Sequence, residues 1–248
     1  NNLAQLYEAI GNYVAAEPLF KSALEIRDKV LGENDPDYAI SLNNLAGLYR
    51  QLGNYTASEI YYNKAVLILK KTVGVEHPNY ATTVSNLAYL YHKTGKYIQA
   101  ENLFKESLAT REKVLGQEHP DYSISLSNLA GLYGDMARFI EAENLYKQAL
   151  IIDKKKLGEN HPSYAISLNN IASLYEDMGN YTLAENTYQQ ALTILKNSFG
   201  ENHATYAVSL NNLGYLYESM GNYTNAEKLY KQSSDITKKV LGETHHDY

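Results

Sequence analysis

The chain has 248 residues, of which 44% are hydrophobic, and a formal net charge of −6. This length and composition suffice for the cores of one or two domains. The sequence contains no cysteine, which excludes disulfides and thiolate chemistry. The acidic balance and the lack of a Lys/Arg stripe argue against nucleic-acid binding, because such proteins neutralise phosphates with basic side chains.

Nothing in the sequence predicts contact with a membrane. No run approaches the roughly 18 apolar residues that a bilayer crossing needs. The opening stretch, NNLAQLYEAI, lacks the basic and apolar regions of a secretory signal. We therefore expect a cytoplasmic location, which the lack of cysteine also favours.

One pattern recurs along the chain with a period of 42 residues. The phrase SLNNLAGLYRQLGNYTASEIYY begins at Ser41 and returns at Ser167 as SLNNIASLYEDMGNYTLAENTY. A turn glycine precedes the aromatic residue by two places in every copy except one, where Ala137 takes its position. The copies are expected at approximately residues 1–36, 37–78, 79–120, 121–162, 163–204 and 205–248.

Each copy is predicted to hold two helices. In the first, Leu42, Leu45 and Tyr49 recur at steps of three and four, which is the spacing of one helix face. Linkers such as LGENDPDY separate the copies. In this linker the glycine is expected to end one helix and the proline to open the next. The second helices of three copies are expected to begin with an N-cap hydroxyl, and the second helices are expected to pack through small residues. The N-cap candidates are Thr56, Thr182 and Thr224, and the small residues include Ala16, Ser58, Ala100, Ala142, Ala184 and Ala226.

The motifs L-x-x-L-A-x-L-Y, G-x-Y and A-E-x-x-Y/F resemble those of the tetratricopeptide repeat (TPR). The 42-residue period and the stretch EIRDKVLGENDPDYAISLNNLAGLY are similar to the longer-repeat branch found in kinesin light chains and nephrocystin-3. This resemblance covers the whole chain. It implies an all-α solenoid of about six hairpins, stacked into a right-handed superhelix, with a concave groove lined mainly by the first helix of each hairpin.

The repeats are expected to form one solenoid domain, residues 1–248, since stacked hairpins share a continuous core. The chain begins within a first helix and stops just after a linker, without a polar capping helix at either end. We therefore expect a fragment of a longer protein, whose ends can stack against other copies.

The tyrosines divide into residues predicted to pack and candidate peptide contacts. Of 24 tyrosines, 21 recur at fixed places in the repeat and are predicted to pack, including those that follow each turn. Tyr61, Tyr89 and Tyr215 do not recur. Tyr89 and Tyr215 point away from the predicted core of the first helix, so they are candidate peptide contacts. The alternative is a surface aromatic without a partner.

Charges on the first helices are sorted along the chain. Basic groups lie in the early repeats, and acidic groups lie in the later ones. A groove lined this way predicts a peptide with acidic residues near repeats two and three and basic residues near repeats four to six. Chance sorting of seven charges is the alternative. The basic set is Arg50, His92 and Lys93, and the acidic set is Asp135, Glu176, Asp177 and Glu218.

Asparagine recurs inside the first helix of every copy, although it costs roughly half a kcal/mol there relative to alanine. Two interpretations remain open and are compatible. The amides could form a structural ladder between repeats, or they could grip a peptide backbone, as groove asparagines of TPR proteins are thought to do. The asparagines on which the second interpretation depends are Asn43, Asn44, Asn86, Asn128, Asn170 and Asn212.

No catalytic or metal site is expected. His77, His119, His161, His203 and His245 lie on successive hairpins, whereas zinc holds its ligands at about 2 Å. We interpret them as linker residues that cap or brace the next helix, and only His245 and His246 are adjacent. The N-Y-T sequons are explained as turns, and neither a phosphate-binding loop nor a nucleophile paired with histidine is found.

The sequence therefore favours a non-enzymatic scaffold, without a cofactor, that binds a protein or peptide in its groove. The competing interpretation is a structural spacer or rod that associates end to end. Nucleic acid and membrane are not expected partners.

Overall fold

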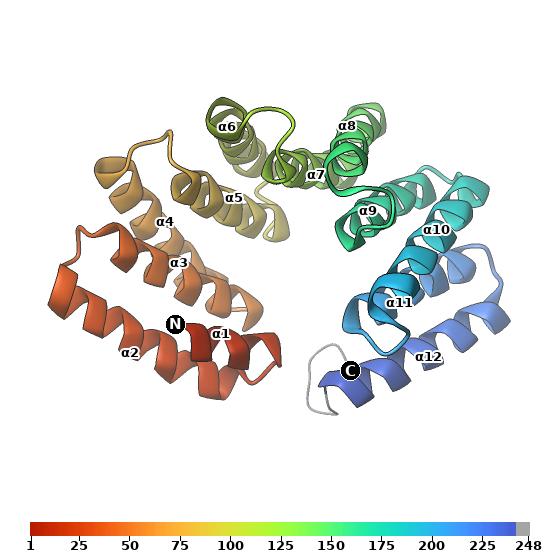
Figure 1. Cartoon of the computed structure of the whole chain (residues 1–248), viewed down its shortest axis with the longest axis horizontal. Coiled ribbons are helices and arrows are strands. Elements are labelled where there is room, and N and C mark those ends of the chain that lie inside the picture. Colours follow the sequence, from red (N-terminus) through yellow and green to blue (C-terminus); the bar gives the residue numbers. More distant parts are fainter. Residues whose placement is uncertain (242–248) are drawn as a thin grey trace. The chain divides into compact units, whose positions relative to one another are not determined.

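The computed structural model describes residues 1–241, which form α-helices and no strand (Figure 1). The helices alternate between a first and a second member of a hairpin, as the periodicity predicts. Six hairpins result, and the all-α repeat architecture is confirmed. The bounds are α1 Asn2–Ala9, α2 Tyr13–Leu31, α3 Pro36–Gln51, α4 Tyr55–Thr72, α5 Pro78–Lys93, α6 Tyr97–Leu115, α7 Pro120–Asp135, α8 Phe139–Leu157, α9 Pro162–Asp177, α10 Tyr181–Phe199, α11 Ala204–Ser219 and α12 Tyr223–Leu241.

The helices belong to two compact units. Unit 1, Asn1–Gln117, holds α1 to α6, and unit 2, Glu118–Tyr248, holds α7 to α12. Within each unit the helices of a hairpin pack together, and each second helix packs against the first helix of the next hairpin. First helices also contact one another, α3 with α5 in unit 1 and α9 with both α7 and α11 in unit 2. A single domain over the whole chain and the right-handed superhelix stay predictions.

Histidines start the first helices of four hairpins. The Nδ1 atom of His119 accepts a 3.1 Å hydrogen bond from the backbone N–H of Asp121, two residues into the turn. His77, His161 and His203 make the same contact, and Asp35 does so for α3 through its carboxylate. These bonds satisfy donors that have no partner within the helix, so the predicted capping role is confirmed for these histidines. His245 and His246 lie outside the described residues.

Asparagine, not threonine, supplies the side-chain cap of α2, α4 and α12. The N-cap residues of α6, α8 and α10 make no such hydrogen bond. Asn12 and Asn54 accept the backbone N–H groups of Ala15 and Ala57, each at 3.1 Å. The prediction for Thr56, Thr182 and Thr224 is wrong because each of these lies one residue inside its helix. The capping side chain must come from the residue before the first helical position, and the turn sequence G-N-Y places asparagine there.

The hairpin interior is built as the pattern predicts. The predicted small residues on the second helices are buried, each at most 3% exposed, and Ser58 turns its hydroxyl to the Ala46 carbonyl at 2.8 Å. Phe20, Tyr62, Phe104 and Tyr188 fill the space beside them and are fully buried. Close helix approach and ring packing therefore occur at the same level of each hairpin.

Tyrosine hydroxyls tie successive hairpins together. Tyr49 donates to Glu17 at 3.0 Å, and Tyr91 donates to Glu59 at 2.9 Å. Tyr217 makes the equivalent bond to Glu185 at 2.6 Å. Each bond joins the end of a first helix to the second helix of the preceding hairpin. The glutamate of the A-E motif is thus an acceptor between repeats, a role that the repeat pattern alone did not reveal.

The tyrosines that follow the turns do not pack as predicted. Tyr55, Tyr97, Tyr181 and Tyr223 are all exposed, Tyr223 to 69%. As first residues of their helices they lie at the edge of the hairpin, so the neighbouring helices do not cover them. By contrast, Tyr61 is half-buried and stacks on Tyr49 with ring centroids 5.6 Å apart.

Within residues 1–241, none of the helices combines the length and the apolar character that a bilayer crossing requires.

Candidate functional site

Four residues of α9 share one face of the helix: Ile166, Asn170, Ser173 and Asp177. At about 100° per residue they lie within roughly 60° of one another around the helix axis. The equivalent residues of α7 and α11 stand beside them, because both helices contact α9. We call this surface the unit 2 face. Its other members are Ile124, Asn128, Gly131 and Asp135 on α7, and Val208, Asn212, Tyr215 and Ser219 on α11.

The predicted basic residues of unit 1 gather around one ring. The guanidinium of Arg50 lies 4.9 Å from the centroid of the Tyr89 ring, and the Lys93 ammonium lies 5.6 Å from it. The His92 ring meets the Tyr89 ring edge-on at 6.2 Å. The ring quadrupole attracts both cations. Tyr89 is therefore the half-buried centre of a cationic cluster.

The unit 1 asparagines bond to one another. Asn86 donates from Nδ2 to the Oδ1 atom of Asn43 at 2.9 Å, and Asn43 donates to Asn44 at 3.3 Å. This chain of amides crosses from α5 to α3. It is the kind of bridge that the structural interpretation of the recurring asparagines requires.

In unit 2 the adjacent asparagines Asn169 and Asn170 differ in burial and in hydrogen bonding. Asn169 is buried and accepts a 2.8 Å hydrogen bond from the Ser209 hydroxyl, which joins α9 to α11. Asn170 and Asn212 are half-buried, and neither side chain hydrogen-bonds to any residue in the described part of the chain. Asn128, on α7, is also half-buried. At Asn170 and Asn212 the unit 2 face thus presents amides whose bonding capacity is not used within the described part of the chain.

The acidic residues fall into two sets. Asp135 and Asp177 lie on the unit 2 face and are exposed. Desolvation raises the pKa of Asp177, and the neighbouring Asp135 charge raises it further. A partly desolvated carboxylate beside a second negative charge favours an incoming cation.

Glu176 is placed differently and is withdrawn from the candidate site. It is buried, and its carboxylate accepts hydrogen bonds from Ser219 at 2.9 Å and Tyr188 at 3.4 Å. Burial raises the pKa of Glu176, and these bonds act against that rise. The residue is rotated by about 100° from Asp177 around the helix, which turns it toward α10 instead of the open face. Glu218 has the same position in α11 and accepts a 2.6 Å bond from Tyr230.

Tyr215 is the most accessible of the predicted aromatic contacts. It lies on the unit 2 face and is 59% exposed, which agrees with its predicted orientation away from the core. Ser173 occupies the equivalent position of α9 and Gly131 that of α7.

Two hollows open on the unit 2 face. The first has a volume of about 280 Å³ and lies between Ile124 and Ile166, with Leu157 and Asn128 also in its wall. The second has a volume of about 130 Å³. Asn170 lines both, so one amide stands between an apolar hollow and an acidic one. The second hollow is lined by Gly131, Gly134, Asp135, Tyr146, Asn170, Ser173, Leu174 and Asp177.

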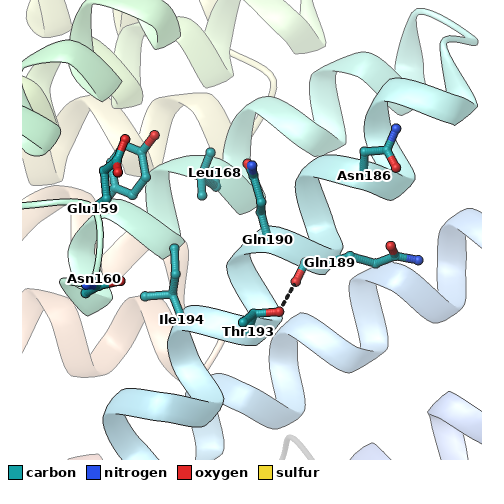
Figure 2. Close-up of a pocket in the computed structure, with 9 residues that line it drawn as sticks. Glu159, Asn160, Leu168, Asn186, Gln189, Gln190, Thr193 and Ile194 are labelled. Atoms are coloured by element: carbon teal, nitrogen blue, oxygen red, sulfur yellow. Dashed lines mark hydrogen bonds between the residues drawn. The ribbon is translucent and has the colours of Figure 1, made fainter.

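A larger hollow of about 630 Å³ lies between α9 and α10 (Figure 2). Leu168 lines it, and two helix positions at about 100° each place Leu168 on the side of α9 opposite Asn170. The Thr193 hydroxyl turns back to the Gln189 carbonyl at 2.9 Å. Glu159, the acid at its rim, is ion-paired with Lys154. None of the predicted contact residues lines this hollow.

The family model described as Tetratricopeptide repeat matches the chain over the overlapping segments 1–71, 39–113, 79–155, 121–197, 163–239 and 206–248. The chain belongs to the tetratricopeptide repeat family.

Solved structures agree with this assignment. TPR-like repeats of a Podosopora anserina protein, provisionally described as a kinesin light chain, are 28% identical to the chain. The match covers 83% of this chain and 97% of that one with a TM-score of 0.64, and a variant of that protein gives 0.65. BtubC from P. vanneervenii shares the fold, with 21% identity, a TM-score of 0.69 and coverage of 94% and 93%. No curated protein sequence matches the chain.

In this TPR chain the candidate residues form two local groups. Arg50, Tyr89, His92 and Lys93 come together in unit 1, and Asp135, Asn170 and Asp177 line one hollow in unit 2. Sequence reasoning missed Tyr146 and Gly134. The available signal was the glycine at a position where other copies carry a charged or polar side chain.

Proposed function

We propose that this TPR chain is a non-catalytic scaffold that binds an extended segment of a partner protein along the first helices of its hairpins. The observation that carries the proposal is the condition of Asn170 and Asn212, which are half-buried on the unit 2 face without a hydrogen-bond partner among residues 1–241. A side-chain amide can both donate to and accept from a peptide backbone. Such contacts hold an extended chain whatever its sequence.

Side-chain specificity comes from the surroundings of these amides. The 280 Å³ hollow between Ile124 and Ile166 suits an aliphatic side chain. Tyr215, exposed on the same face, adds contact area at low entropic cost. These features give the unit 2 face an apolar anchor beside its backbone contacts.

Charge sets the direction of the bound segment. The cluster of Arg50, His92 and Lys93 around Tyr89 suits acidic residues, and Asp135 with Asp177 suits basic ones. The preferred partner therefore carries acidic residues for unit 1 and basic residues for unit 2. The similarity to kinesin light chain-like repeats supports an interaction role. A cysteine-free chain also suits the reducing cytoplasm, where we place this scaffold.

An array of 12-residue peptides of varied charge pattern, followed by fluorescence anisotropy on the strongest binders, tests the proposal. We expect binders with separated acidic and basic halves, and weaker binding when the halves are reversed. Replacing both Asn170 and Asn212 with alanine should weaken binding about tenfold, the effect of losing two hydrogen bonds of about 0.7 kcal/mol each. Gln189→Ala, in the hollow on the other side of α9, is the matched control.

Light scattering over a concentration series tests the competing interpretation, a rod that associates end to end. A scaffold that binds peptides should keep a constant mass. A mass that increases with concentration, together with no peptide bound above background, would favour the self-associating rod over the scaffold.

A further inference from the structure

In the third, fifth and sixth hairpins, the aromatic residue in the middle of the second helix contacts the residue of the first helix that lies 12 positions earlier. Tyr188 donates to Glu176 and Tyr230 donates to Glu218 across this separation. Phe104 instead meets the His92 ring edge-on at 6.4 Å. In the fourth hairpin the corresponding pair is Tyr146 and Gly134, so the first helix supplies no side chain.

Tyr146 consequently lacks a side chain opposite it on the first helix. Only 7% of the residue is exposed, yet its hydroxyl hydrogen-bonds to no residue in the described part of the chain. The hydroxyl lies 3.3 Å from the point where a Cβ atom on Gly131 would stand. Gly131 and Gly134 both line the 130 Å³ hollow, so the two glycines leave open the space into which this hydroxyl points.

The walls of the hollow are negative. Burial raises the pKa of Tyr146, and the charges of Asp135 and Asp177 raise it further, which places both carboxylates within electrostatic reach of the hydroxyl. Asp177 forms no ion pair with any residue between 1 and 241. No basic side chain is among the residues that line the hollow. Asn170 and Ser173 add further oxygen acceptors.

We propose that this hollow is a specificity pocket for the cationic end of a lysine or arginine side chain of the bound segment. This inference rests on the proposed scaffold function and names one side chain that the scaffold selects. The cation lies against Asp177 and donates to the Tyr146 hydroxyl, whose lone pairs are unused. Asn170 lines this pocket and the neighbouring apolar hollow, so the basic residue is close in sequence to an aliphatic one.

A small probe tests the pocket without requiring a peptide partner. Nα-acetyl-lysine methylamide is titrated into the ¹⁵N-labelled full chain, and Nα-acetyl-norleucine methylamide, which lacks the ammonium group, is the matched control. We expect chemical-shift changes at Gly131, Gly134 and Ser173 with the lysine probe alone. The arginine analogue reports which cation is preferred.

Two variants assign the effect to named atoms. Asp177→Asn should weaken lysine-probe binding about tenfold, because it removes a charge-assisted contact. Gly134→Gln should abolish binding, since its amide would reach the Tyr146 hydroxyl and fill the hollow. A Cβ at residue 134 meets only Leu174 at 3.5 Å, an ordinary contact, so this variant should fold. Gln189→Ala should change nothing.

The outcomes separate the pocket from the scaffold. Equal shifts with the lysine and norleucine probes, or binding unaffected by Asp177→Asn and Gly134→Gln, would overturn the pocket. Peptides that bind regardless of any basic residue would retain the scaffold and reject the pocket. A lysine probe that binds while no peptide does would retain the pocket and reject the groove.

Discussion

The amide of Asn86 donates a 2.9 Å hydrogen bond to the side chain of Asn43, across the boundary between two hairpins of unit 1. Asn43 in turn donates to Asn44. In unit 2, Asn212 occupies the same repeat position as Asn86 and makes no such bond within the described residues. The same repeat position thus has a structural use at Asn86 and an unused bonding capacity at Asn212 within the described residues.

Asn86→Ala should lower the free energy of unfolding by about 1 kcal/mol, because it removes one hydrogen bond and leaves the part-buried Asn43 oxygen without its donor. Asn212→Ala should change stability by less than about 0.5 kcal/mol, since no intramolecular bond is lost. Urea unfolding of both variants measures the difference. Equal effects would contradict the division of roles.

Ala137 adopts a left-handed backbone conformation, with φ of 57°, at the position that glycine occupies in the other turns. A residue with a Cβ atom is strained there by about 1 kcal/mol or more. Ala137→Gly should therefore raise the free energy of unfolding by roughly 1 kcal/mol. Thermal and urea unfolding measure the change.

The control substitution is expected to change the free energy of unfolding in the opposite direction. Ala109 is exposed within α6, where glycine costs about 1 kcal/mol relative to alanine. Ala109→Gly should destabilise the chain by that amount. If both substitutions destabilise, the strain at Ala137 is absent in solution.

The sequence predicted those features that depend on spacing alone. Helix period, turn glycines and small packing residues recur every 42 residues, so each copy supports the assignment of the others. The histidine caps were predicted because a histidine stands before the first residue of the first helix in four of the hairpins. Local geometry determines each of these features.

Features that depend on orientation were harder to predict. Glu176 and Asp177 are adjacent, but a rotation of about 100° places one against Tyr188 and the other on the open face. The pairing of Tyr146 with Gly134 requires knowledge of which residues meet across a hairpin. Once the contact between Tyr188 and Glu176 is known, the period transfers it to every copy, and the exception becomes visible.

His161→Ala should lower the free energy of unfolding by about 1 kcal/mol, the usual value of an N-cap, because the Ser163 N–H loses its acceptor. His161→Asp should keep most of the stability, since Asp35 caps α3 with the same geometry. Chemical unfolding compares the two variants. An aspartate variant as weak as the alanine variant would show that the imidazole acts through packing.

Glu176 gives unfolding a defined pH dependence. Burial raises the pKa of its carboxyl above the ordinary value of about 4.3 that it regains on unfolding. The folded state therefore holds this proton more tightly, and ionisation of Glu176 destabilises it above the folded-state pKa. Glu176→Gln removes this penalty and keeps groups that can bond to Ser219 and Tyr188. At pH 7 the variant should match or exceed the wild type, and its advantage should decline to zero as the pH falls to about 4. Urea unfolding at several pH values measures the difference, and an advantage that grows on acidification would reverse the assigned sign.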